Sequence, residues 1–123
     1  EEEVFAGRAE VLDTFEINGK SRAIKYQING MKVTSGALKD DQFFRVLRDD
    51  ETIYDKLQVK TMKIFKEDVK QVMTGNECGI QLVPKNADEG EHEEAETQGL
   101  YGIKLQPGDI VESYVVELSR AKN

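Results

Sequence analysis

The feature that most constrains the fold is a series of short segments in which apolar and polar residues alternate, separated by residues that favour tight turns. In residues 22–28 the apolar members of the alternation are Ile24, Tyr26 and Ile28. A period of two residues is typical of a β-strand with one buried and one exposed face. Asn29-Gly30 follows, and this pair fits either a bulge or a tight corner.

The N-terminal region shows the same period. In residues 7–17, Ala9, Val11 and Phe15 lie at even spacing, as on one face of a strand. Asn18-Gly19 comes next and is a strong signal for a β-hairpin. These residues therefore predict a strand that ends in a tight turn.

Further strands are predicted along the rest of the chain at 31–36, 43–50, 52–60, 77–83 and 106–120. An Asp49-Asp50-Glu51 turn is expected to join the second and third of these. Residues 61–73 are ambiguous, because their apolar residues recur near helical spacing and would fit one helix. Two short strands around Lys66-Glu67-Asp68 fit the all-β setting better. Many short strands at roughly ten-residue spacing favour a small closed barrel or a sandwich. A barrel has the advantage that it leaves no exposed sheet edges.

Length and charge limit the class of protein. A chain of 123 residues is expected to form one domain, residues 1–123, with a single modest core. Of the net charge of −7, residues 84–99 contribute −5 and residues 1–3 contribute −3, so the remainder carries +1. The overall charge is therefore a poor guide to a nucleic-acid partner. We expect residues 1–6 to form an acidic N-terminal extension and residues 84–102 an acidic inserted loop.

Other classes are disfavoured by what the sequence contains. No apolar stretch approaches the roughly 18 residues of a membrane span, so no membrane partner is expected. The chain starts with three glutamates and not with Met, which predicts a piece of a longer protein without a signal or transit peptide at this end. A single cysteine excludes an internal disulfide and fits a reducing compartment.

Cys78 and His92 are the only cysteine and histidine, and they restrict the chemistry of the chain. One residue of each kind is too few for a usual zinc site, and the sequence contains no glycine-rich phosphate-binding loop. His92 lies in the acidic segment, where nothing would hold it beside a thiol as a base. The acidic run lacks the spacing of a calcium-binding loop and is expected to be solvated. We therefore expect no enzymatic activity and no cofactor.

Four segments together carry a family resemblance: 28–33 (INGMKV), 44–57 (FRVLRDDETIYDKL), 62–80 (MKIFKEDVKQVMTGNECGI) and 106–117 (QPGDIVESYVVE). They resemble the extreme C-terminal domain of translation initiation factor 2 of the bacterial and organellar type. The Lys-x-Phe-Lys-Glu-Asp-Val and Glu-Cys-Gly motifs are the most specific parts of this resemblance. The similarity covers almost the whole chain outside the acidic insertion.

The resemblance implies a fold and a function. The fold would be all-β, a small closed six-stranded antiparallel β-barrel like domain II of elongation factor Tu. The domain would act as a monomer that binds the formylmethionyl group and the adjacent 3′ CCA end of initiator tRNA. It would serve the small ribosomal subunit through the full-length factor, in which an upstream domain hydrolyses GTP. The alternative function is a protein-docking β-barrel that contacts another initiation factor or the ribosome.

The resemblance also implies eight ligand-contacting residues in three places: Met31; Lys63, Ile64, Phe65 and Lys66; and Glu77, Cys78 and Gly79. Phe65 would stack on the terminal adenosine, and Lys63 would contact the CCA phosphates. Glu77 would accept a hydrogen bond from the formamide N–H or a ribose hydroxyl. Cys78 would offer a soft wall to the methionine thioether, and Gly79 would allow close approach of the ligand.

The chain departs from the family pattern at three places. Ile64 stands where an arginine is usual, Met31 stands where a second cysteine is usual, and the acidic insertion lengthens a short loop. We expect Met31 to line the opposite side of the pocket and to narrow it, and selectivity for the formyl group to be relaxed. These departures point to a mitochondrial factor acting in the matrix, with the bacterial cytoplasm as the alternative. Without the resemblance, Phe65 and Met31 would be read as core residues.

Overall fold

The computed structural model describes residues 1–18, 25–85 and 103–117, and the regular elements in these ranges are β-strands. The strands are β1 (Glu2–Asn18), β2 (Lys25–Lys39), β3 (Phe43–Arg48), β4 (Glu51–Ile64), β5 (Glu67–Asp68), β6 (Gln71–Met73), β7 (Glu77–Pro84) and β8 (Ile110–Glu117). Within the described part of the chain, no helix is long and apolar enough to cross a membrane.

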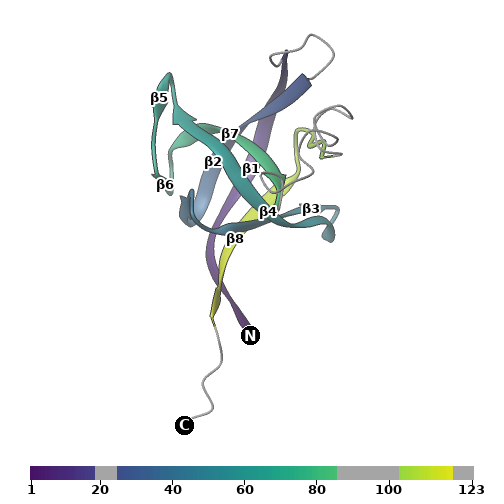
Figure 1. Cartoon of the computed structure of the whole chain (residues 1–123), viewed down its shortest axis with the longest axis vertical. Coiled ribbons are helices and arrows are strands. Elements are labelled where there is room, and N and C mark those ends of the chain that lie inside the picture. The colour runs from purple at the N-terminus through teal and green to yellow at the C-terminus, as the bar shows by residue number, and fades with distance from the viewer. Residues whose placement is uncertain (19–24, 86–102, 118–123) are drawn as a thin grey trace.

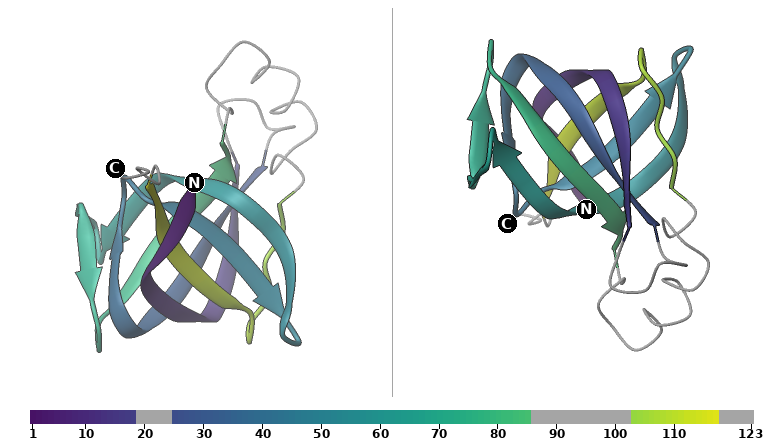
Figure 2. Two further views of the ribbon diagram at one scale, coloured as in Figure 1. Left: turned by 90° about the horizontal axis from the view of Figure 1, so that it is seen from below. Right: turned by 90° about the horizontal axis from the view of Figure 1, so that it is seen from above.

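Six strands form a closed antiparallel ring in the order β1–β8–β3–β4–β7–β2, and the pairing of β2 with β1 closes it (Figure 1 and Figure 2). β5 and β6 lie outside the ring, where β5 pairs with β4 and β6 pairs with β2. The fold is therefore the all-β, six-stranded antiparallel barrel that the sequence predicts.

Two local predictions are confirmed by the strand boundaries. Asp49 and Asp50 join β3 to β4 with positive φ values of 54° and 67°. Two successive positive φ values are typical of a type I′ turn, whose twist matches that of the flanking strands. Residues 61–73 contain the end of β4 followed by β5 and β6, and no helix. β2 runs through Asn29-Gly30 without a turn.

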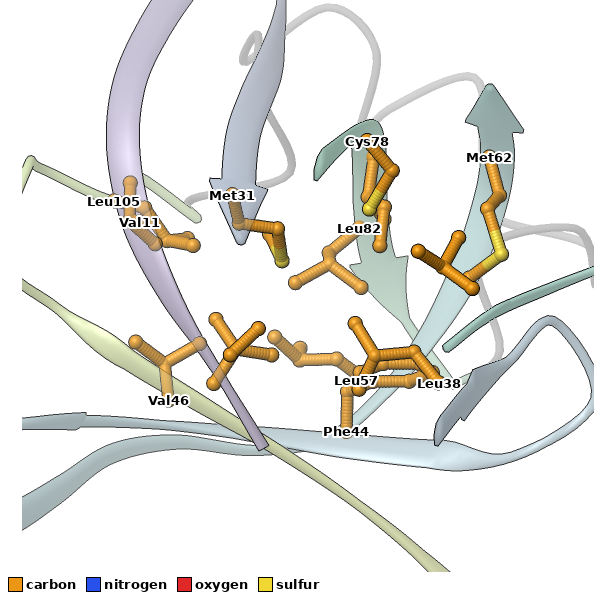
Figure 3. Packing of buried hydrophobic residues seen from close by; sticks show 14 of the residues in the cluster. Val11, Met31, Leu38, Phe44, Val46, Leu57, Met62, Cys78, Leu82 and Leu105 are labelled. Atoms are coloured by element: carbon orange, nitrogen blue, oxygen red, sulfur yellow. The ribbon is translucent and has the colours of Figure 1, made fainter. Parts of the chain in front are cut away.

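The inside of the ring is filled by apolar side chains from every strand of the barrel (Figure 3). Fully buried members include Val33, Leu38, Phe44, Ile80 and Val111. Burial of one such side chain stabilises the fold by about 1.5–3 kcal/mol, so the core supplies most of the stabilising free energy. The face of each strand that carries these residues points inward, and the opposite face forms the outer surface of the barrel.

A bulge at Leu12 changes the side-chain alternation of β1. Val11 and Asp13 pair with consecutive residues of β2, so Leu12 has no partner of its own. One extra residue sends every later side chain to the other face of the strand. Ala9 and Val11 consequently lie in the core, whereas Phe15 is 55% exposed. The prediction that these residues share one face is wrong for Phe15, because the bulge lies between them.

The N-terminal segment also differs from its prediction. Residues 1–6 are expected to form an extension, but β1 begins at Glu2 and pairs with the end of β8 from its first residue. The Glu3 carboxylate accepts a hydrogen bond from Arg45 and lies 3.8 Å from the Lys56 ammonium. These two cations offset the negative charge of Glu3 where the segment joins the sheet. His92, Gly19 and all but the first two residues of the predicted acidic loop lie outside the described residues.

The ring closes where two glycines face each other, Gly7 of β1 and Gly36 of β2. A Cβ on Gly7 would lie 2.3 Å from the carbonyl oxygen of Ala37, and a Cβ on Gly36 would lie 2.1 Å from that of Ala6. Both obstacles are backbone atoms of paired strands and cannot move aside independently. Closure at this point therefore requires residues without a side chain.

We expect Gly7→Ala to lower the free energy of unfolding by about 1–3 kcal/mol, because the added methyl group overpacks the closure point. Urea unfolding followed by circular dichroism measures this change. Gly30→Ala is the matched control, since a Cβ there meets its nearest atoms at 3.7–4.0 Å, which is ordinary van der Waals contact. Equal urea midpoints for the two variants would contradict the role of Gly7.

Candidate binding site

A hollow of about 520 Å³ opens on the outer face of the barrel, beside the turns that lead from β4 to β5 and from β6 to β7. Its lining residues are Phe15, Gly30, Ile64, Phe65, Gly75, Asn76, Glu77, Cys78 and Gly79. A volume of this size is within the usual range for small-molecule sites, about 300–1,000 Å³. Five of the eight residues predicted from the sequence line this one hollow.

Two glycines on neighbouring strands form the floor of the hollow. Gly79 of β7 pairs with Gly30 of β2 on one side and with Lys63 of β4 on the other. A Cβ on Gly30 would meet only ordinary contacts, and a Cβ on Gly79 would lie 3.3 Å from the Ile28 Cγ2. Packing therefore does not require glycine at position 30. The missing side chains instead leave a depression that a ligand can enter.

Phe65 stands at the β4 side of the hollow and is 97% exposed. Ile64 pairs with Glu67, so Phe65 and Lys66 are the two central residues of a hairpin turn. Phe65 has a φ of 58°, in the left-handed region, where a bulky residue costs about 1–2 kcal/mol. Because the Phe65 ring is exposed, no free energy of burial offsets this cost. Phe65 is therefore not a core residue, and its ring is open to a ligand in the hollow.

The cations predicted for the site lie at its rim. Lys63 is exposed on the outer face of β4, next to Gly79 in the strand register. Lys66 is exposed in the turn beside Phe65. Ile64, which stands in place of the usual arginine, lines the hollow and packs partly against the core. The β4 side of the hollow thus combines two lysines with an apolar wall.

Cys78 borders the hollow, but its side chain is only 6% exposed and belongs to the core (Figure 3). Burial raises the pKa of the Cys78 thiol to about 12. The thiol is therefore protonated near neutral pH, which argues against a nucleophilic role. Its small exposed fraction also leaves little of the sulfur for the predicted contact with a methionine side chain. Glu77, one residue earlier, is exposed and lines the hollow.

Met31 is predicted to line the pocket, but the structure places it in the core with no exposed surface. The reason is strand alternation, because Met31 follows Gly30, and Gly30 faces outward. Met31 is instead the register partner of Cys78 on the inner face. It neither contacts a ligand in the hollow nor narrows it, and this part of the prediction is corrected.

Four lining residues are missed by sequence reasoning: Phe15, Gly30, Gly75 and Asn76. Gly75 and Asn76 directly precede the predicted Glu77–Gly79 segment. The even spacing of Ala9, Val11 and Phe15 predicts an inward Phe15, and nothing in the residue types reveals the bulge at Leu12. Gly30 does give a signal, because Asn29-Gly30 marks a backbone irregularity, but the pair fits a bulge or corner equally well. The partnership of Gly30 with Gly79 becomes visible only in the strand register.

A second hollow of about 130 Å³ lies near Arg45 and Tyr114, and its charged groups are paired within the protein. The Arg45 guanidinium bonds to Glu3 and lies 4.2 Å from the centre of the Tyr114 ring. The Tyr114 hydroxyl donates a 2.6 Å hydrogen bond to Asp55. Burial and this carboxylate raise the pKa of Tyr114 to about 12. These contacts hold the strands together and leave no free cation for a ligand among them.

Among the residues that the structure describes, no group of three or more His, Cys, Asp or Glu side chains could hold a metal ion.

Solved structures with the same fold define the class of domain. Translation elongation factor SelB from Methanococcus maripaludis, in its apo form, superposes with a TM-score of 0.54 and 16% identity over 89% of this chain and 19% of that chain. The S. cerevisiae Ski7 GTPase-like domain, bound to GDP and inorganic phosphate, superposes with a TM-score of 0.56 and 14% identity over 90% of this chain and 23% of that chain. The chain is thus a barrel of the domain II type.

Proteins similar in sequence show the family to which this chain belongs. Translation initiation factor IF-2 from Bacillus cereus (strain AH187) is 34% identical over 116 residues, and the one from Persephonella marina is 32% identical over 122 residues. The matches cover 94% and 99% of this chain, but only 14% and 11% of the respective relatives. No family model matches the chain. The chain belongs to the translation initiation factor IF-2 family, in which it corresponds to one domain-sized segment, consistent with the predicted C-terminal domain.

These relatives are bacterial, and they do not support the predicted mitochondrial location.

We expect Phe65→Gly to raise the free energy of unfolding by about 1 kcal/mol, because glycine adopts a positive φ without strain. A shift of the urea midpoint to higher concentration would show it. The control is Lys66→Gly in the same turn, where no positive φ occurs and the extra backbone freedom should lower stability. A destabilised Phe65→Gly variant would mean that the ring supports the fold.

Proposed function

We propose that the hollow binds the formylmethionyl-adenosine end of initiator tRNA, and that the domain serves translation initiation by binding without a reaction of its own. Membership of the IF-2 family supports a role in translation initiation. The finer assignment is carried by one observation. Residues from two separate motifs, Phe65 and the Glu77–Gly79 segment, meet over a floor of two glycines, of which Gly30 is not required by packing.

The chemistry of the hollow suits such a ligand. A free aminoacyl amine is largely cationic near neutral pH, whereas a formylated amine is neutral and can enter a partly apolar hollow. Phe65 can stack on the terminal adenine, which contributes about 1–3 kcal/mol per base in other proteins. Glu77 can accept a hydrogen bond from the formamide N–H or from a ribose hydroxyl. Gly30 and Gly79 let the ligand approach the backbone.

Lys63 and Lys66 complete the nucleotide side of the site. Both residues are exposed on the β4 side of the hollow, close to Phe65 in the sequence, where the phosphates of a CCA end would follow the terminal nucleoside. Contacts of this kind position a nucleic acid without reading its sequence. Ile64 replaces one cation of the family pattern, so fewer phosphate contacts are available. Because Met31 lies in the core, the expectation of relaxed formyl selectivity rests on the two remaining departures, Ile64 and the acidic insertion. Contacts with the ribosome and GTP hydrolysis belong to the full-length factor in this proposal.

Gly30→Val tests the proposal, because its side chain would fill the hollow from the floor. We expect the affinity for formylmethionyl initiator tRNA to fall at least about tenfold, the equivalent of about 1.4 kcal/mol, with an unchanged urea midpoint. Fluorescence titration of labelled tRNA gives the affinity. Initiator tRNA without an attached amino acid should bind weakly to both the unaltered chain and the Gly30→Val variant.

The matched control is Thr34→Val, which adds the same side chain to the same outer face of β2 outside the hollow. Thr34 makes one exposed hydrogen bond of 3.2 Å to the Arg8 carbonyl, so its replacement should leave tRNA binding unchanged. Full affinity of Gly30→Val, or equal loss in both variants, would refute the proposed site.

A further inference from the structure

We propose that Phe15 contacts the amino-acid side chain of the ligand and sets the preference for methionine, while Phe65 takes the adenine. The aminoacyl-adenosine end would then lie across four strands of the barrel, with its nucleoside over β4 and its side chain over β1. This inference rests on the proposed function and assigns an orientation to the ligand within it.

The strand order separates the two aromatic residues. Phe15 belongs to β1 and Phe65 follows β4, and between them lie β2 and β7 with their two glycines. Neighbouring strands are about 4.8 Å apart, so three spacings span about 14 Å. Side chains on the outer face of a closed barrel stand away from the sheet and diverge. The two rings therefore suit two different groups of one ligand better than two faces of one base.

The bulge at Leu12 is what brings Phe15 to the hollow. Without it, strand alternation would turn the ring into the core with Val11. With it, the ring is 55% exposed, and its Cε2 atom lies 4.0 Å from the position that a Cβ on Gly30 would occupy. The ring thus leans over the glycine floor. Bulges commonly redirect a side chain beside a functional site.

The charges at the two ends of the floor differ, and the difference favours one direction of the ligand. One row across the outer face runs from Asp13 through Gly30 and Gly79 to Lys63, and Asp68 of β5 is the next partner of Lys63. Lys63 and Lys66 at the β4 end are balanced by Glu67 and Asp68, so that end carries no net charge, whereas the Asp13 end is negative and repels the phosphates of a nucleic acid. The nearby Lys104 does not reverse this, because its ammonium lies 3.8 Å from the Glu16 carboxylate. The nucleotide therefore belongs over β4, which leaves the β1 end to the amino-acid side chain.

Phe15 also supplies the chemistry that Cys78 cannot. A thioether contacts an aromatic ring favourably, with the sulfur commonly near the ring edge, and apolar contact adds to this. The Cys78 side chain is turned into the core, whereas the Phe15 ring is open to the hollow. A methionine side chain placed at the β1 end would meet this ring, and an alanine side chain would be too short to do so.

Two hydrolysis-resistant probes test the assignment: N-formylmethionyl-3′-amino-3′-deoxyadenosine and its N-formylalanyl counterpart. We expect the unaltered chain to prefer the methionyl probe. Phe15→Ala should reduce this preference by about three- to tenfold by weakening the methionyl probe alone. Phe65→Ala should weaken both probes by the same factor, because both carry the adenine. Ile17→Ala is the matched control, since Ile17 is 50% exposed on the same strand and does not line the hollow.

The readout is a ratio of two affinities, so a partly unfolded variant lowers both values and leaves the ratio intact. A Phe15→Ala variant that keeps the urea midpoint of the unaltered chain and weakens both probes equally, or neither, would overturn the role of Phe15. So would an unaltered chain that binds both probes equally well. If the unaltered chain binds neither probe, the proposed function fails as well as this inference. If the unaltered chain binds the probes but Phe15→Ala does not change the ratio of the two affinities, only this inference fails.

Discussion

The pairing of β1 with β2 is the constraint on which the rest of the structure depends. It closes the ring, and it does so through Gly7 and Gly36, whose missing side chains allow the two backbones to meet. Closure sets the register of β2 against β7, which in turn places Gly30 beside Gly79. The same pairing carries the bulge that turns Phe15 outward. The hollow is therefore a consequence of how the barrel closes.

Several features of the hollow do not serve stability. Phe65 combines a left-handed backbone with an almost fully exposed ring, Phe15 is exposed on a strand, and Gly30 has room for a side chain. Each would be replaced by a more stabilising choice if the fold were the only requirement. By contrast, the network of Arg45, Tyr114 and Asp55 satisfies its own charges and holds the strands together. This contrast distinguishes a site open to a ligand from a structural cluster.

Much of the fold could be predicted from the sequence, because alternation and turn residues are local signals. The strands at 43–48 and 77–84 and the Asp49-Asp50 turn follow from such signals, whereas the absence of a helix in 61–73 follows from the all-β setting of that segment. The family resemblance added the closed ring and the segments around Phe65 and Glu77. The inclusion of residues 2–6 in β1 could not be predicted, because it depends on cations contributed by distant strands.

The candidate site was predictable only in part for the same reason. Phe65, Glu77 and Gly79 sit in motifs, and the structure brings them together. Phe15 could not be found, since a single unpaired residue at Leu12 reverses the face it occupies. The prediction for Met31 is wrong because a sequence motif does not determine which face of a strand each of its residues occupies. Side-chain direction in a barrel depends on register, and register is fixed by pairing partners far away in the sequence.

Amide chemical-shift mapping with N-formylmethionyl-3′-amino-3′-deoxyadenosine tests the central claim most directly, because it locates the ligand without altering the protein. The account predicts that the largest shifts fall on residues 13–15, 28–30, 63–66 and 75–79, which surround the hollow. Largest shifts around Arg45 and Tyr114, at the other hollow, would contradict it. So would saturating binding that leaves the amides of Gly30 and Gly79 unmoved.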